Sequence, residues 1–143
     1  MFGGLSISAS GLTANRTWLD VIANNIANAN TTRTPQGGPY RSEQVVFGEL
    51  PAASSFSGAL QSAVQGNVGG GVGVTSIVQS PAPFSLVYDP SSPDAVNGYV
   101  QMPNVNLTTQ MINMISASRA YQANVTAFDA TKQMDVEAIG IGK

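Results

Sequence analysis

Apolar residues recur at helical spacing near both ends of the chain. In the N-terminal stretch 4–30, which no proline interrupts, they stand seven apart, with one further isoleucine between the last two. A seven-residue repeat is typical of one face of a helix that packs as a coiled coil. We therefore predict a long helix over residues 4–30. Its seam is Leu5, Leu12, Leu19, Ile22 and Ile26.

The C-terminal stretch 104–139 carries the same signal more regularly. Its positions follow the alternating four-three spacing of a heptad: Leu107, Met111, Met114, Ser118, Tyr121, Val125 and Phe128. Asn104 or Asn106, just after Pro103, is suited to cap the start of this helix because a short amide accepts bonds from the first-turn N–H groups. Two long helices at the two ends of a chain pair with each other when the middle folds back between them.

The middle of the chain, residues 31–103, contains all eight prolines. Asn97-Gly98 is a short-hairpin signal because both residues tolerate positive φ. The stretches 72-VGVTSIV-78 and 84-FSLVY-88 have strand composition, whereas residues 51–71 are small, uncharged and typical of a flexible linker. We expect an α+β fold that is mainly α, with the terminal helices paired as a coiled coil around a small β-rich insert.

The chain is sparingly charged. Of its 143 residues only 10% are Asp, Glu, Lys or Arg, compared with roughly a quarter in typical globular proteins. Soluble monomers usually carry more charge, so we expect this surface either to be polar without charge, like a carbohydrate, or to be mostly buried against partners. The net charge is −2 with no basic run, which excludes nucleic acid as a partner.

The sequence offers little catalytic chemistry. It has no cysteine and no histidine, which removes thiol nucleophiles, disulfides, the usual zinc sites and the commonest general base. The glycine-rich run 66-GNVGGGVGV-74 lacks the lysine of a phosphate-binding loop. Asp129, Asp135 and Glu137 are typical of a solvated helix end. We expect no enzyme activity, no cofactor and no metal.

No apolar run is long enough to span a bilayer, and the first residues lack the basic and apolar regions of a secretory signal peptide. We therefore expect no direct membrane insertion and no cleaved signal.

The segment 19-LDVIANNIANANTT-32 contains an unusual number of amides for a helix: Asn24, Asn25, Asn28 and Asn30. Asparagine is a mediocre helix former, so its repeated use on a helix indicates a role other than helix formation. One hypothesis places them in a polar interface between subunits, where they fix the register of helices that fold on assembly. The alternative is a local role, with Asn28 to Thr32 fraying into a loop.

This segment resembles the signature of the bacterial flagellar axial proteins, the rod and hook family. The helix 111-MINMISASRAYQANVTAFDATKQM-134 is similar to the family's C-terminal helix. The stretches 30-NTTRTPQGGPYRSEQVVF-47 and 72–106 resemble its proximal rod proteins, so that the resemblance covers all but about residues 48–71.

The resemblance implies a structural subunit of the basal-body proximal rod, a hollow helical drive shaft that crosses the periplasm and transmits torque for motility. It also implies an extended intersubunit arm at 31–50. With the elements read from the residues, we expect three further parts: 1–30 with 104–143 as the terminal coiled-coil domain, 51–71 as a linker and 72–103 as the insert. Implied partners are other copies, other rod proteins, the membrane ring at the proximal end and, during transit, the flagellar type III export apparatus. The alternative is a soluble helical adaptor that binds one partner through its C-terminal heptad stripe.

Overall fold

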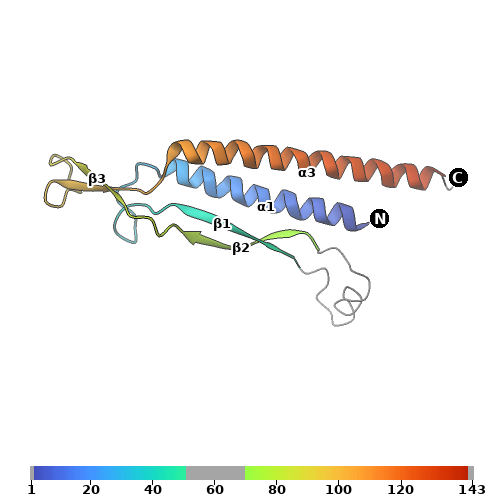
Figure 1. Ribbon diagram of the computed structural model, residues 1–143, viewed down its shortest axis with the longest axis horizontal. Helices are drawn as coiled ribbons and strands as arrows, with labels where there is room; N and C mark the ends of the chain where they lie inside the picture. The colour runs from blue at the N-terminus through green and yellow to red at the C-terminus, as the bar shows by residue number, and fades with distance from the viewer. Residues whose placement is uncertain (1, 51–69, 142–143) are drawn as a thin grey trace, which may run out of the picture.

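A computed structural model describes residues 2–50 and 70–141 as an elongated molecule (Figure 1). Two long helices run along it, a two-stranded sheet lies beside them, and a second hairpin projects from one end. The elements in chain order are α1 (Phe2–Ala27), β1 (Glu43–Glu49), β2 (Val72–Gln79), β3 (Ser85–Tyr88), β4 (Tyr99–Met102) and α3 (Leu107–Ile141).

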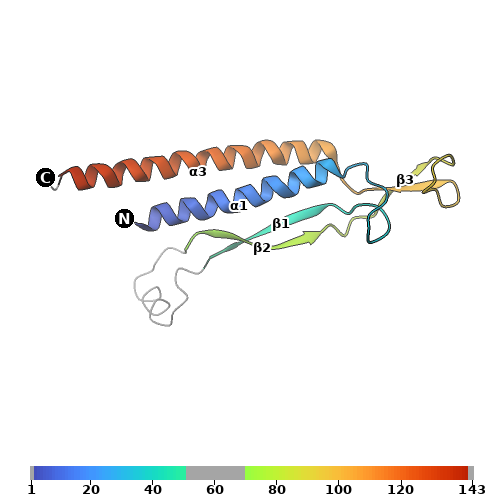
Figure 2. The same cartoon turned by 180° about the vertical axis from the view of Figure 1, so that it is seen from behind.

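The two helices lie side by side and antiparallel, with both chain ends at the same pole of the molecule (Figures 1 and 2). The β1–β2 sheet lies along α1, so that α1 runs between α3 and the sheet. Because α3 is 35 residues long and α1 only 26, α3 continues past the N-terminal end of α1.

The ends of the helices follow local chemistry. Asn106 caps α3, since its Oδ1 accepts a hydrogen bond from the N–H of Thr109 at 3.0 Å. Of the two predicted caps, Asn106 is therefore confirmed. α1 ends at Ala27, and residues 28–30 continue as turns. Asn24 and Asn25 thus lie on the helix, whereas Asn28 and Asn30 lie just beyond it.

β1 and β2 form an antiparallel ladder in which Glu43 is opposite Gln79 and Glu49 is opposite Val72. The register shifts at a bulge between Val46 and Phe47. β2 includes the predicted strand 72–78, which is confirmed. β1 belongs to the segment expected as the arm and β2 to the segment expected as the insert, so this ladder joins the two.

The predicted tight turn at Asn97-Gly98 is present just before β4, and it ends the longer connection 89–98 that joins β3 to β4. Asn97 and Gly98 have φ of 54° and 80°, and Val96 and Tyr99 bridge on either side of them. Tyr88 lies opposite Tyr99, and their rings pack edge to face with centroids 5.3 Å apart. The linker expected at 51–71 lies, except for its last two residues, outside the described part of the chain.

The described part of the chain buries few large side chains. Its buried apolar residues are Ala14, Val21, Ile22, Val100 and Ala117, and its buried polar ones are Ser8, Asn25 and Ser42. None of the described helices is long and apolar enough to cross a membrane. The fold is α+β with two long helices and small antiparallel sheets, as expected at that level.

Candidate assembly interface

The contact between the two helices is made by small and polar residues. A Cβ atom placed on Gly4 would lie 3.2 Å from Cγ2 of Thr131, and one on Gly11 would lie 2.9 Å from Oδ1 of Asn124. Near the other end, Asn25 donates a hydrogen bond to Gln110. The contact residues of α3, which are Gln110, Asn124 and Thr131, are seven or fourteen residues apart, and so are those of α1. Ala117, halfway between Gln110 and Asn124, is fully buried.

Part of the predicted apolar seam lies one residue after a contact position, as Leu12 and Val125 do. The rest lies three residues before one, as Ile22 and Tyr121 do. On α1, Ile22 is buried, but the leucines and Ile26 are only half-buried. On α3 the stripe is largely exposed: Leu107 44%, Met111 50%, Tyr121 37% and Val125 36%, with Met114, Ser118 and Phe128 half-buried. These α3 residues do not form the centre of the contact within one chain. Their part in an assembly interface stays a prediction.

The two apolar stripes lie on the same side of the helix pair. Leu5 and Leu12 each follow a contact glycine by one residue, and Met111 and Val125 likewise follow Gln110 and Asn124. One residue turns a helix by about 100°, and in an antiparallel pair this same turn leads to the same side on both helices. The pair therefore presents one shared apolar side, called here the open face: Leu5, Leu12, Leu19, Ile26, Leu107, Met111, Met114, Tyr121, Val125 and Phe128.

On the side opposite the open face, other segments of the chain cover α1. The N–H of Val72 donates to Oγ of Ser10 at 3.1 Å, and Asn24 lies 3.4 Å from the hydroxyl of Tyr40. Ser10 and Asn24 each precede a contact position by one residue, so they point to the side away from the open face. Trp18 adds an edge-to-face contact with Phe47, whose ring centroid lies 5.7 Å away. β1, β2 and the segment before them thus cover this side of α1, whereas α3 packs on α1 alone among the described helices and strands.

Asn25 holds three segments together. It is 1% exposed, and its Oδ1 accepts from the N–H of Glu43 and from the hydroxyl of Tyr40, both at 2.9 Å. Its Nδ2 donates to the carbonyl of Glu43 at 2.7 Å and to Oε1 of Gln110 at 3.3 Å. An amide has two donors and two acceptor positions, so every one of them is used. Asn25 therefore bonds within one chain, whereas the hypothesis placed the asparagines between subunits.

The Tyr40 hydroxyl is held in its protonated form. Burial, and secondly the nearby carboxylate of Glu43, raises the pKa of Tyr40 above its usual value. Only the neutral phenol can donate to Asn25. The link between α1 and the start of β1 therefore depends on an un-ionised tyrosine.

The other asparagines of the motif act locally at the end of α1. Nδ2 of Asn28 donates to the carbonyl and to Oδ1 of Asn24, at 3.0 and 2.9 Å. Oδ1 of Asn28 accepts from the hydroxyl of Thr31 at 3.2 Å. Asn30 is exposed. This chain of amides and hydroxyls leads the backbone out of the helix toward residues 31–40.

A second group of hydrogen bonds connects the β1–β2 sheet and the segment before β3 to the residues just before α3. Asn104 accepts from the N–H of Ser42 at 2.8 Å and donates to the carbonyl of Ala82 at 2.9 Å. Arg41 donates to the carbonyl of Ser80 at 2.8 Å and stacks on the ring of Phe84, 4.3 Å from its centroid. Sequence reasoning did not assign Asn104 and Arg41 these roles, since their partners come from distant segments.

Within residues 2–50 and 70–141, no three His, Cys, Asp or Glu side chains gather as a metal would require. The most developed feature of these residues is the helix pair with its open face, which is a surface for packing against other proteins.

The comparisons with known proteins give the class first. A family model described as "Flagella basal body rod protein" matches residues 5–33, which is α1 with the asparagine motif. A second, "Flagellar basal body rod FlgEFG protein C-terminal", matches residues 96–141, which includes β4 and α3. The two matched segments are those that build the helix pair, and they define a flagellar basal-body rod protein.

Individual relatives narrow the class. The flagellar basal-body rod protein FlgC of Bacillus subtilis is 45% identical over 149 residues, which cover 99% of this chain and 98% of the relative. FlgC of Borreliella burgdorferi is 42% identical over 147 residues, covering 99% and 97%. FlgC of Salmonella typhimurium is 42% identical over 138 residues, covering 96% and 94%. The chain belongs to the FlgC family of flagellar basal-body rod proteins, a family of structural proteins and not of enzymes.

Proposed function

We propose that this chain is a subunit of the proximal rod, and that it polymerises by packing its open face against the helices of neighbouring subunits. Its terminal helices act as a coiled coil that lines a hollow helical drive shaft, and this shaft transmits torque. The residues of the predicted seam have their role here, between subunits. The observation that carries the proposal is the exposed apolar stripe of α3, on the side of the helix pair that the described residues leave uncovered.

Physical chemistry supports this use of the open face. Contiguous exposed apolar surface on a chain with so little charge favours association over a free monomer. From residue 104 to residue 128 the only charged side chain of α3 is Arg119, which lies two residues past Ala117 and so points away from α1. Helices of neighbouring subunits can therefore approach the stripe without burying a charge.

The proposal extends to parts of the chain and to its surroundings. Residues 1–30 with 104–143 act as the helical domain, 31–50 as an arm toward a neighbour, 51–71 as a linker and 72–103 as the insert. Partners are other copies, other rod proteins and the membrane ring at the proximal end. The subunit reaches the rod through the flagellar type III export apparatus, without a cleaved signal, and works where the rod crosses the periplasm.

The test separates assembly from folding. Met111→Asp and Tyr121→Asp place a charge on the open face at positions that are already half exposed, so the monomer should keep its stability to within about 0.5 kcal/mol. Incorporation into isolated basal bodies, and swimming, should both be lost. Thr126→Asp, two residues past the contact position Asn124 and exposed, is the matched control and should assemble normally.

Motile cells that carry either open-face variant would refute the assignment of this face. A stable monomer or dimer that binds one partner and never polymerises would favour the helical adaptor instead.

A further inference from the structure

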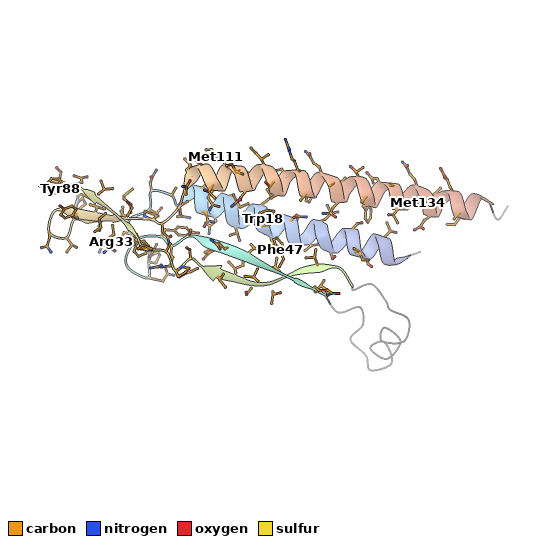
Figure 3. The ribbon with its side chains drawn as sticks, viewed as in Figure 1. Trp18, Arg33, Phe47, Tyr88, Met111 and Met134 are labelled. Carbon is orange, nitrogen blue, oxygen red and sulfur yellow. The ribbon has the colours of Figure 1, made fainter. Side chains whose placement is uncertain are left out.

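The tight turn before β4 contains Asn97 and Gly98, the only Asn-Gly pair in the full sequence. Val96 and Tyr99 close the turn with two backbone hydrogen bonds, at 2.9 and 3.1 Å. The turn belongs to the β3–β4 hairpin, which projects past the helix pair, as Figure 3 shows with Tyr88 near its tip. The pair is thus held on a part of the molecule that water reaches.

The side-chain amide of Asn97 is free to react. Asn97 is exposed, and within residues 2–50 and 70–141 no group hydrogen-bonds its side chain. The N–H of Gly98, the next residue, has no acceptor among these residues either. By contrast, the amides of Asn25 and Asn104 are hydrogen-bonded to other segments. The amide carbon of Asn97 and the following backbone nitrogen are therefore both available.

We propose that Asn97 is a site of spontaneous deamidation, and that its isoaspartate product irreversibly loosens the β3–β4 hairpin. The nitrogen of Gly98 attacks Cγ of Asn97 and loses its proton, while the bond from Cγ to Nδ2 breaks and the amide nitrogen leaves as ammonia. A succinimide ring remains. One water molecule then opens the ring at either carbonyl, which gives aspartate or isoaspartate, and no oxidant, reductant or cofactor is needed.

The turn itself requires this reactive pair. A two-residue turn with positive φ at both positions favours Asn-Gly. A Cβ atom at position 98 would be strained at a φ of 80° and would lie 3.1 Å from a ring carbon of Tyr88. Glycine has no Cβ, so nothing shields its nitrogen from the approach of Cγ. The residue that gives the hairpin its shape therefore also leaves Asn97 open to attack.

The stability of the hairpin controls the reaction. Ring closure needs a rotation of the backbone at Asn97 that is incompatible with the closed turn, so the bonds between Val96 and Tyr99 must open first. The hairpin forms a two-stranded sheet of its own, and all four residues of β3 are exposed. Such a hairpin is marginally stable, so the turn opens readily. The chain should consequently deamidate at Asn97 without global unfolding.

The two products differ in their effect on the turn. Isoaspartate carries the main chain through the side-chain carbon and lengthens it by one atom, so a two-residue turn no longer fits. The bond from the N–H of Asp89 to the carbonyl of Gly98, at 3.0 Å, and the ring contact of Tyr88 with Tyr99 then lose their geometry. Asp-Gly is also favoured in this turn, so the aspartate product should keep the hairpin.

The first experiment measures the modification. The purified full chain is incubated at pH 6 and at pH 8, and its peptides are followed by mass spectrometry. The peptide with Asn97 should gain just under one dalton roughly tenfold or more faster than the peptide with Asn30, which is exposed but followed by Thr31 instead of glycine. The rate should be higher at pH 8, since attack needs a deprotonated nitrogen.

A matched variant identifies the residue. Isoaspartate is assayed by methylation of its carboxyl group with a protein isoaspartate methyltransferase and S-adenosylmethionine. The parent chain should accept methyl groups after incubation. Asn97→Gly keeps the turn, because Gly-Gly also suits it, and should lose most of this signal.

The second experiment measures the effect on the hairpin. Hydrogen exchange of peptides from residues 85–102 should be severalfold faster in the isoaspartate fraction than in fresh protein, because the turn that aligns the strands is lost. Freshly purified Asn97→Asp has the charge of the product without the longer backbone, and it should exchange like the parent.

Conversion of Asn97 no faster than that of Asn30 would overturn the site. Isoaspartate without faster exchange in residues 85–102 would overturn its effect on the hairpin. Equally fast exchange in Asn97→Asp would overturn the lengthened backbone as the cause. These measurements use the unassembled chain, so they are independent of the role proposed for the open face.

Discussion

At Asn25 one side-chain amide takes the place of a neighbouring strand. Its oxygen accepts from the N–H of Glu43 and its nitrogen donates to the carbonyl of the same residue, as a paired strand would. The remaining donor and acceptor reach Gln110 and Tyr40. A single buried residue therefore fixes α1 relative both to α3 and to the start of β1.

Replacing Asn25 by Ala should destabilise the folded chain by about 2–4 kcal/mol, because both backbone groups of Glu43 lose their partner inside the protein. Urea unfolding of the purified protein measures this loss. Asn30→Ala, at an exposed asparagine of the same motif, is the control and should change stability by less than about 0.5 kcal/mol. Equal effects of the two changes would show that the hydrogen bonds of Asn25 add nothing specific to the stability of the folded chain.

Stability should also depend on alkaline pH through Tyr40. Its raised pKa means that the folded chain holds the phenolic proton more tightly than the unfolded chain does. This contribution is complete below the unfolded pKa of about 10, and it is lost as pH rises through that value toward the folded pKa. At pH 8 Tyr40→Phe should be less stable than the parent by about 1 kcal/mol, for the lost bond to Asn25.

The gap between the parent and Tyr40→Phe should narrow above pH 10, since phenylalanine does not ionise. Urea midpoints at pH 8 and pH 10.5 give both values. A gap that stays constant with pH would show that Tyr40 ionises alike in the folded and unfolded chains.

At the scale of single residues the sequence allowed some roles to be predicted and not others. Asn106 and the pair Asn97-Gly98 act through neighbours in the chain, so their cap and turn could be predicted. The partners of Asn25 and Asn104 lie up to 85 residues away in sequence, and no local pattern indicates such bonds. The unusual number of asparagines indicated that this segment has a specific role, but it did not indicate which residues they contact.

The helix pair illustrates how an element can pack through residues that carry no apolar signal. Gly4 and Gly11 let α3 approach closely, and Asn124 and Thr131 fill the space above them. Small residues at a contact allow the backbones to come together, which leaves the larger side chains of the neighbouring positions pointing to one side. That side is the open face.

Gly11→Leu should therefore push the helices apart. The first carbon of the new side chain would already lie 2.9 Å from Oδ1 of Asn124, and overpacking of this kind costs about 1–3 kcal/mol. Gly140→Leu is the matched control, since a Cβ there meets nothing within 4 Å. It should leave stability unchanged or raise it by up to about 1 kcal/mol, because leucine is the better helix former.

The comparison is made by thermal unfolding followed by circular dichroism. Equal losses for Gly11→Leu and Gly140→Leu would mean that the helices do not pair through Gly11.

The existence and approximate length of both helices could be predicted from their apolar period. The residues through which the two helices touch could not be predicted. The seven-residue rule places the apolar residues in the contact between paired helices, whereas here small and polar residues make the contact. The column that does make contact is visible in the sequence as Gly4, Gly11 and Asn25, spaced by seven or fourteen residues.

Across the whole molecule, buried residues concentrate toward one end of the helix pair. Val21, Ile22 and Asn25 lie near the C-terminus of α1, and Ala117 lies in the N-terminal part of α3, which packs beside it. Toward the chain ends, the described pair relies on close contacts of small and polar residues such as Gly4 with Thr131, and the large apolar side chains between Met134 and Ile139 are exposed. Few apolar side chains there offset the entropy of ordering the backbone.

This asymmetry predicts how folding is coupled to assembly. In dilute monomer, hydrogen exchange read by peptide mass spectrometry should be slow for peptides around residues 18–27 and 107–117. It should be fast for residues 2–10 and 128–141, because local opening is cheapest where few apolar contacts are lost. In assembled rods both ends should become protected. Protection along the full length of both helices in dilute protein would mean that the helices pair unaided and would favour the adaptor. Fast exchange around Asn25 would instead mean that even its saturated hydrogen bonds form only on assembly.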